Sequence, residues 1–354
     1  MAPHPASAPV RIYRGRRRAR PIASLKSSRA RRTVARDSPA PTAVRRRRWG
    51  APILRRIPLG LRYMAAAAFF FAVMSAMVKL VSHHIPVAET VFARSLVGLL
   101  LSVWMLRRAR ISALGVRRGM LLLRGLFGFA ALSLYFYAIS ELPLADATVL
   151  QYTNPVWTAL LAGIFLRERV TPRVVGASVV ALVGVALVAR PAFLFGAAAS
   201  GLPLLPVLAG LAGAVCSAAA YVTVRTLRTT DHALVVVLYF PLVATPAAVP
   251  AMLPDAVWPA PVDLALLLAI GVCVQIAQVF MTRGIHLEPA GRATAVSYVQ
   301  VAFAYTLGIV AFGEAPSAGG LAGAALIIGA ALYVAVQRPR PAPAARLAPG
   351  DDPP

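Results

Sequence analysis

The hydrophobic residues of this chain occur in long, nearly unbroken windows that are separated by short polar connections. A helix needs about 20 residues to cross about 30 Å of hydrocarbon, and ten windows reach that length. They cover residues 62–82, 87–106, 118–140, 143–166, 172–190, 203–224, 233–252, 263–283, 289–312 and 317–337. The pattern predicts an all-α integral membrane protein in which ten transmembrane helices pack as one bundle.

The composition agrees with a membrane protein. The chain is 59% hydrophobic and 14% charged, whereas an ordinary soluble domain is about 45–50% apolar and about 25% charged. Of the 37 Lys and Arg residues, 18 lie at or before Arg62, together with a single acid, Asp37. We therefore expect residues 1–61 to form a disordered Arg-rich tail, and residues 339–354 to form a second tail.

The composition of the first tail fits more than one role. Its arginines favour contact with anionic lipid headgroups. An organelle transit peptide, or an upstream extension of the gene model with a later start such as Met64, fits the same composition. A nucleic-acid-binding arm is disfavoured because the tail lacks interleaved aromatic residues, so no nucleic-acid partner is expected.

Basic residues alternate between the two sides of the predicted bundle. The odd-numbered connections contain one basic residue, Arg190. The even-numbered connections and the C-terminal flank contain Arg107, Arg108, Arg110, Arg117, Arg118, Arg167, Arg169, Arg173, Arg225, Arg228, Arg283, Arg292, Arg338, Arg340 and Arg346. Because basic loops stay in the cytoplasm, we predict that both the N and C termini are cytoplasmic and that the protein lies in the inner (plasma) membrane.

The second half of the chain repeats the first at an offset of 146 residues. The matched pairs are Pro143 with Pro289, Thr148 with Thr294, Tyr152 with Tyr298, Glu168 with Glu314, and Lys79 with Arg225. Each predicted repeat, 62–195 and 203–338, holds five helices, so the second copy enters the membrane from the opposite side. Inverted five-helix repeats of this kind are typical of secondary transporters with one site between the two halves.

Residues 123–191, which include "ELPLADATVLQYTNPVWTALLAGIFLRERVTP", resemble the EamA repeat of the drug/metabolite transporter superfamily. The shared features are Leu-Pro-Leu-Ala entering the fourth helix, a proline within it, a glutamate closing it and a Gly-rich fifth helix. The second copy is weaker, with Val301 where the first has Pro155. The resemblance implies export or uptake of small polar metabolites such as amino acids, purines, riboflavin or S-adenosylmethionine.

Polar and aromatic side chains inside the helices are candidates for a central substrate cavity, because lipid cannot satisfy their hydrogen bonds. The candidates are Tyr135, Thr148, Gln151, Tyr152, Asn154, Tyr221, Gln275, Gln278, Thr294, Tyr298 and Tyr305. The alternative for each is interhelical hydrogen bonding, packing or an interfacial position. Pro155 is expected to kink the fourth helix and to free a carbonyl near Gln151.

Several charged residues fall inside the windows or at their ends. Arg94 and Arg124 each carry a cost of about 2.5–3.5 kcal/mol near a membrane centre. Either they attract an anionic group of a substrate, or they snorkel or bond backbone carbonyls. Lys79 and Glu89 flank one turn and are expected to pair with each other.

Three further acids have an expected place. Glu168 and Glu314 close equivalent helices, where a structural role with secondary gating is expected. Asp146, like Glu89, is a conceivable proton-coupling acid, but its position near the outer surface indicates a loop charge.

The sequence contains no GxxxxGK[ST], HExxH or GxSxG motif, so we expect neither an enzyme nor a cofactor. The favoured function is secondary or facilitative transport of a small-molecule substrate across the bilayer by alternating access. A membrane-embedded lipid-modifying enzyme and a lipid-associated regulatory protein are the alternatives. Gly319 and Gly323 form a GxxxG pair, which fits either a homodimer or close packing within the chain.

Overall fold

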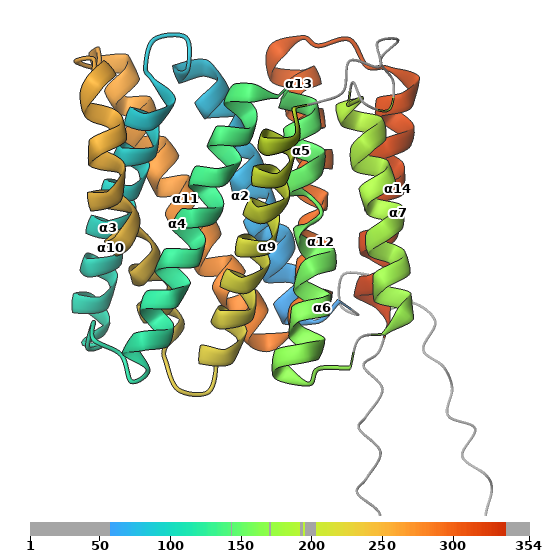
Figure 1. The fold of residues 1–354 in the computed structure, drawn as a ribbon, viewed down its shortest axis with the longest axis horizontal. Coiled ribbons are helices and arrows are strands. Elements are labelled where there is room, and N and C mark those ends of the chain that lie inside the picture. The colour runs from blue at the N-terminus through green and yellow to red at the C-terminus, as the bar shows by residue number, and fades with distance from the viewer. Residues whose placement is uncertain (1–56, 143, 170, 192–193, 195–202, 338–354) are drawn as a thin grey trace, which may run out of the picture. The chain divides into compact units, whose positions relative to one another are not determined.

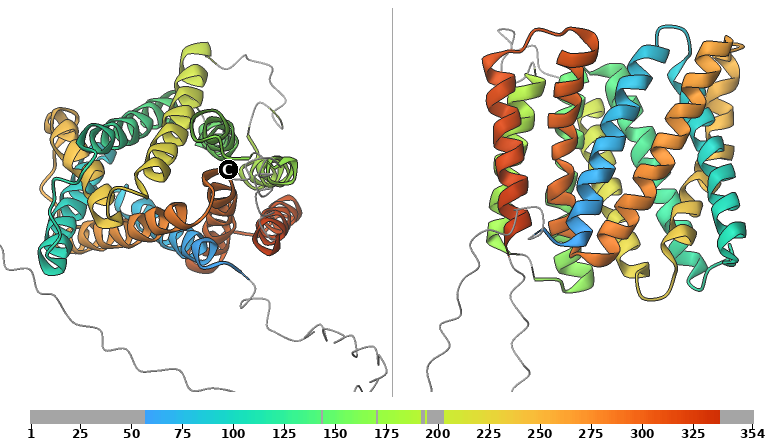
Figure 2. Two further views of the ribbon diagram at one scale, coloured as in Figure 1. Left: turned by 90° about the horizontal axis from the view of Figure 1, so that it is seen from below. Right: turned by 180° about the vertical axis from the view of Figure 1, so that it is seen from behind.

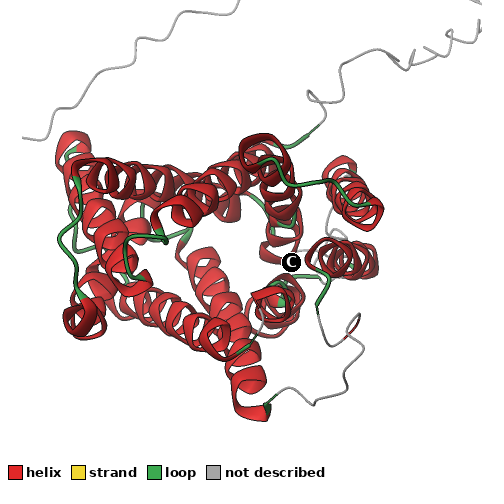
Figure 3. Ribbon diagram, turned by 90° about the horizontal axis from the view of Figure 1, so that it is seen from above, coloured by secondary structure: helices red, strands yellow, loops and turns green. Residues whose placement is uncertain are grey.

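The computed structural model describes residues 57–142, 144–169, 171–191, 194 and 203–337. The predicted tails lie almost entirely outside these residues. The helices are α2 (Leu59–Val81), α3 (Val87–Ala109), α4 (Arg118–Glu141), α5 (Leu144–Gln151), α6 (Asn154–Leu166), α7 (Pro172–Ala189), α9 (Leu204–Leu227), α10 (Ala233–Met252), α11 (Pro261–Leu287), α12 (Ala290–Ser297), α13 (Val299–Phe312) and α14 (Ala318–Val336), with a short 3-10 turn at Leu253–Asp255. Figure 3 shows these residues as helices joined by loops, without a strand among them.

Ten segments of this part of the chain are long and apolar enough to cross a membrane, as the hydrophobic windows predict. Two of them consist of paired short helices, α5 with α6 and α12 with α13. The first repeat supplies α2 to α7 and the second supplies α9 to α14. Figure 1 shows the helices standing side by side as one bundle.

The helix bounds obey the same offset as the sequence. The segment Leu144–Gln151 corresponds to Ala290–Ser297, and both helices end one residue before a matched tyrosine. The repeats also interlock, because α2 packs against α11, α4 against α9, α3 against α10 and α7 against α14. The centre of the bundle is therefore built from both repeats at once (Figure 2).

The fourth and ninth spans are each broken near the middle. Pro155 lies in the first turn of α6, and the side-chain amide of Asn154 donates to the Gln151 carbonyl at 2.9 Å. The ninth span breaks at Tyr298 although Val301 stands where the first repeat has Pro155. The break is therefore a property of both repeats, and the proline reinforces it in one.

Glycine allows α7 and α14 to approach each other. A Cβ atom on Gly323 would lie 2.5 Å from the Gly184 carbonyl oxygen, and a Cβ on Gly184 would lie 2.7 Å from the Gly323 carbonyl oxygen. Gly323 of the predicted GxxxG pair thus packs against another helix of the same chain, which is the second of the two interpretations given for that pair.

The two ends of the bundle differ in charge. The connections that follow α3, α6, α9 and α11 lie at one end, the lower end in Figure 1. We name this the basic end because Arg107, Arg167, Arg225 and Arg283 lie in or beside these connections. The opposite end holds Lys79, in the last turn of α2.

Candidate functional site

Two tyrosines related by the repeat meet at the middle of the bundle. Tyr152 and Tyr298 follow the ends of α5 and α12, and their rings stack with centroids 6.1 Å apart and an interplanar angle of 27°. Tyr135 and Tyr221 lie within electrostatic range of Tyr152. Tyr152 and Tyr298 at the span breaks thus lie together with Tyr135 of α4 and Tyr221 of α9, and we name these four predicted cavity residues the tyrosine cluster.

Polar side chains beside the tyrosine cluster are only partly satisfied. Thr148 contacts the hydroxyl of Tyr135 at 3.4 Å, and the Gln151 side-chain amide donates to the Ser217 hydroxyl at 2.9 Å. In the described part of the chain, the side-chain carbonyl oxygens of Gln151 and Asn154 and the hydroxyl of Tyr298 have no partner. An unpaired buried polar atom costs about 1–3 kcal/mol. A group of such atoms in one place is typical of a site where a ligand supplies the missing partners.

A second cluster surrounds two arginines in the membrane spans. Arg124 is 2% exposed, donates from Nη2 to Oε1 of Gln278 at 3.3 Å, and places its guanidinium 5.4 Å from the centre of the Phe240 ring. Arg94 lies in a small cavity whose lining includes Phe240, Gln275 and Gln278. We name Arg94, Arg124, Phe240 and Gln278 the arginine cluster. It adjoins the tyrosine cluster, because Tyr221 lies within electrostatic range of Arg124.

Among the residues that the structure describes, neither intramembrane arginine hydrogen-bonds to a backbone carbonyl. In the residues described, Arg124 donates to a side chain and Arg94 makes no hydrogen bond. Gln275, another predicted cavity residue, lines the same small cavity as Gln278 and donates to the Ser102 hydroxyl of α3 at 2.8 Å.

Two predicted cavity residues have their hydroxyl groups paired with the backbone. Thr294 is fully buried and donates to the Ala290 carbonyl of its own helix at 2.9 Å. The Tyr305 hydroxyl accepts from the Ser317 amide at 3.1 Å, at the junction of α13 and α14. We therefore leave both out of the proposed cavity. Conversely, the sequence reasoning missed Ser217 and Phe240; Ser217 lies four residues before Tyr221, a helical spacing that could have revealed it.

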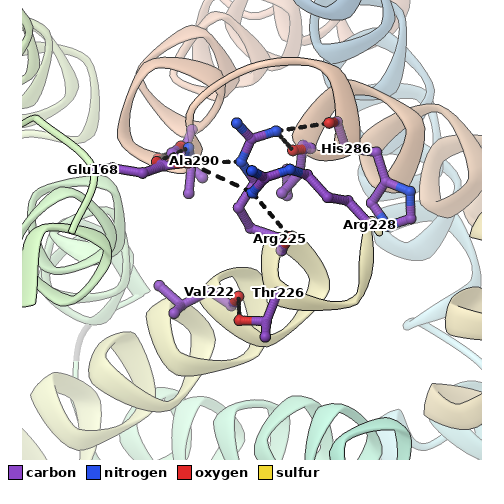
Figure 4. A network of polar contacts seen from close by, with 9 residues as sticks. Glu168, Val222, Arg225, Thr226, Arg228, His286 and Ala290 are labelled. Carbon is purple, nitrogen blue, oxygen red and sulfur yellow. Dashed lines mark hydrogen bonds and ion pairs between the residues drawn. The ribbon is translucent and has the colours of Figure 1, made fainter. Parts of the chain in front are cut away.

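A buried ion pair closes the basic end (Figure 4). Arg225 at the end of α9 donates from Nε to Oε1 of Glu168 at 2.7 Å, and from Nη1 to the carbonyls of Ile285 and His286 at 3.0 and 2.6 Å. Oε2 of Glu168 accepts from the Ala290 amide at 2.9 Å. The pair therefore joins α9 and the end of α6 to the end of α11 and the start of α12.

Arg228 lies at the margin of this network. Its Nη1 is 4.0 Å from Oε1 of Glu168, and burial together with the charge of Arg225 lowers the pKa of its guanidinium. Glu168 thus faces two guanidinium groups.

The repeat-related pair at the opposite end is exposed. Lys79 and Glu314 correspond to Arg225 and Glu168, and Lys79 Nζ lies 2.5 Å from Oε1 of Glu314. Their side chains are 53% and 50% exposed, against 10% for Arg225 and 17% for Glu168. The expected Lys79–Glu89 pair is wrong, because Glu89 instead accepts from the Val257 amide at 3.0 Å.

Helix packing shows the same asymmetry between the ends. At the basic end α9 packs against α11 and α6 against α12, but the equivalent pairs, α2 with α4 and α13 with α5, are not among the closely packed pairs. The described bundle is therefore closed at the basic end and looser at the end that holds Lys79.

Asp146 is fully buried, and in the described residues both of its carboxylate oxygens lack a hydrogen-bond partner. The expected loop charge at this position is therefore wrong, because the start of α5 is folded into the bundle.

Over the residues that the structure describes, no group of three or more His, Cys, Asp or Glu side chains is placed to hold a metal ion.

Comparisons with known proteins agree with this architecture. The model of the EamA-like transporter family matches residues 58–190 and again residues 204–336. The pseudopaline exporter CntI of Pseudomonas aeruginosa is 36% identical over 277 residues, which cover 78% of this chain and 95% of that protein. Solute carrier family 35 member G1 of Mus musculus is 30% identical over 281 residues, which cover 76% of each chain.

A solved crystal structure is similar in fold, with a TM-score of 0.67 and 22% sequence identity over 77% of this chain and 95% of that one. At this identity the likeness shows the fold alone. The ten apolar spans, the two family matches and the named transporters together show that this chain is a member of the EamA-like transporter family, within the drug/metabolite transporter superfamily.

Proposed function

We propose that this protein is a secondary or facilitative transporter that moves a small polar metabolite by alternating access. The proposed cavity lies between the repeats and is lined by the tyrosine cluster and the arginine cluster. Membrane transport itself is supported by the family and by relatives that are named as an exporter and a solute carrier.

One observation carries the alternating mechanism: the two repeat-related ion pairs are in different states. Arg225 and Glu168 are buried against α11 and α12, whereas Lys79 and Glu314 are exposed. Two inverted repeats that exchange conformations open the site first to one side and then to the other. In the opposite state, Lys79 and Glu314 would be the buried pair.

The repeat also predicts the contacts of that second state. Arg225 donates to the carbonyls of Ile285 and His286, whose equivalents 146 residues earlier are Ile139 and Ser140. We therefore expect Lys79 to donate to these two carbonyls at the end of α4 when the end of the bundle that holds Lys79 closes.

The charge pattern supports one orientation. Basic connections stay in the cytoplasm, so the basic end faces the cytoplasm, with both termini on that side of the inner membrane. In this orientation the described structure is closed toward the cytoplasm.

Proteoliposomes test the transport proposal. The purified protein is reconstituted, and exchange of a mixed pool of labelled amino acids, nucleobases and vitamins is measured against protein-free liposomes. We expect at least one solute to exchange. If no solute moves in either direction although the protein is folded and inserted, the proposal is contradicted.

Substitution then tests the cavity. Tyr152→Ala and Gln278→Ala are each expected to lower the exchange rate by about tenfold or more, because both side chains line the proposed solute position. Tyr333→Ala is the control, since Tyr333 is an exposed residue of α14. Unchanged exchange in both cavity variants would refute the cavity while leaving the transporter class intact.

A further inference from the structure

We propose that the solute is an organic oxyanion, carrying carboxylate or phosphate groups, and that its acidic group binds between Arg94 and Arg124. This inference rests on the proposed transport function and names the chemical class of its solute.

Four arginines inside the bundle fall into two kinds; Arg124, Arg225 and Arg292 are buried and Arg94 is half-buried. Arg225 and Arg292 lie near the basic end and are each neutralised by an acid, Glu168 at 2.7 Å and Glu288 at 2.8 Å. Arg94 and Arg124 lie within the spans, and among the described residues neither forms an ion pair. Two positive charges within the spans are therefore not compensated by any acid of the described residues.

Three hydrogen-bond donors of this region are also unused. Nε of Arg94, Nε of Arg124 and the hydroxyl of Ser95 are buried, and none has a partner in the described part of the chain. Arg94 and Ser95 line the same small cavity together with Phe240 and Gln278. Because Arg124 itself contacts Phe240 and Gln278, the unused donors border one region.

An oxyanion supplies what this region lacks. A carboxylate or phosphate accepts several hydrogen bonds, and guanidinium groups bind both in preference to neutral acceptors. The residues that line the cavity include Arg94 and no Asp or Glu, and Arg124 contacts two of them. A cationic solute would therefore meet two positive charges and no acid there. The adjoining rings of Phe240 and Tyr221 offer a surface for the uncharged part of the solute.

The first experiment separates solutes by charge. Proteoliposomes made from uncharged lipid are loaded with acidic metabolites (dicarboxylates and sugar phosphates), neutral ones (amides and nucleosides) and cationic ones (polyamines), and the solutes that leave are identified by mass spectrometry. We expect only acidic solutes to leave faster than they leave protein-free liposomes loaded with the same mixture. Movement of neutral or cationic solutes alone would overturn the oxyanion assignment, whereas movement of no solute would overturn the transport proposal instead.

Matched variants then test the arginines with an acidic solute that moves. Arg94→Gln and Arg124→Gln are each expected to reduce its initial rate at least tenfold, and the lysine variants Arg94→Lys and Arg124→Lys to retain more of it because they keep the charge. The control is Arg107→Gln, since Arg107 is exposed at the end of α3. Loss of transport in the glutamine and lysine variants alike, with all proteins monodisperse, would point to packing and overturn the electrostatic role.

An anionic lipid headgroup offers the same chemistry as a free oxyanion. Native mass spectrometry after reconstitution with phosphatidylglycerol distinguishes the two sources. We expect lipid retention to be equal in the wild type and in Arg94→Gln. Loss of a bound lipid in that variant, with unchanged transport of acidic solutes, would assign the arginines to the lipid and overturn the solute site.

Discussion

At the scale of single residues, a buried polar group that has a hydrogen-bond or ion-pair partner stabilises this fold, and one that has none is available to a ligand. Arg225 and Tyr239 are satisfied by the protein, through Glu168 and the Leu114 carbonyl. Arg124 and Tyr298 are equally buried, but each has a polar atom without a partner in the described residues. Since a buried unpaired group costs free energy, its presence in the centre of the bundle favours a functional role.

The two tyrosines give the first prediction. Tyr298→Phe removes a hydroxyl that has no partner among the described residues, so the melting temperature should stay the same or rise while transport falls. Tyr239→Phe removes a donor to the Leu114 carbonyl at 3.0 Å, so stability should fall by about 1 kcal/mol with transport retained. Thermal unfolding in detergent and proteoliposome exchange measure the two effects. The reverse order of stabilities would contradict this division of roles.

The two ion pairs give the second prediction. Glu168→Gln leaves the buried charge of Arg225 without its acid, and removing one partner of a buried pair costs about 3–5 kcal/mol. Glu314→Gln breaks a half-exposed pair, for which about 0–1 kcal/mol is expected. Chemical denaturation of both variants in detergent measures the difference. Equal destabilisation would show that the two ends are equally closed in solution.

At the scale of helices, close approach and interruption are both built into the two repeats. The break after α5 recurs after α12 without a proline, and in both repeats it falls at the matched tyrosine. The approach of α7 to α14 depends on glycine at the crossing, where each backbone occupies the place of the other's side chain.

The crossing of α7 and α14 gives the third prediction. Gly323→Ala places a methyl group 2.5 Å from the Gly184 carbonyl oxygen, and such overpacking costs about 1–3 kcal/mol. Gly329→Ala, in the same helix, meets no atom within 4 Å and should be neutral or stabilising, because alanine is the better helix former. Thermal unfolding of the two variants measures this difference in stability. Equal stability would mean that α7 and α14 lie farther apart than described.

At the scale of the whole molecule, the inverted repeat predicts a second conformation of the bundle beside the one described. The repeats are similar in sequence and helix bounds, yet the contacts at the two ends of the bundle differ. Because the two repeats are similar, each can adopt the conformation and contacts that the other has in this structure. Alternating access requires this exchange of conformations between the repeats.

Cross-linking tests this exchange as the fourth prediction. In a variant without Cys216 and Cys273, Lys79→Cys with Ser140→Cys should be joined by a short, reducible cross-linker when solute is cycling, and the link should stop transport until it is reduced. Arg225→Cys with His286→Cys should cross-link without solute, because these positions already contact each other. Continued transport with no cross-link at the first pair would rule out the predicted second state.

The sequence alone predicted the ten spans, the two repeats and the family, because the length of an apolar window and the recurrence of a motif are properties of neighbouring residues. It also related Tyr152 to Tyr298 through the repeat and named both as cavity candidates, but it did not predict that their rings stack on each other.

Only the tertiary structure decided which distant side chains became partners. Lys79 pairs with Glu314 rather than with its near neighbour Glu89, and Asp146 is buried rather than at the surface. Among the described residues, no acid pairs with Arg94 or Arg124, whereas acids neutralise the arginines near the basic end. Hydropathy places each helix across the bilayer but does not fix its rotation or its neighbours. Those are set by packing between segments far apart in the chain, and partnership and burial depend on that packing.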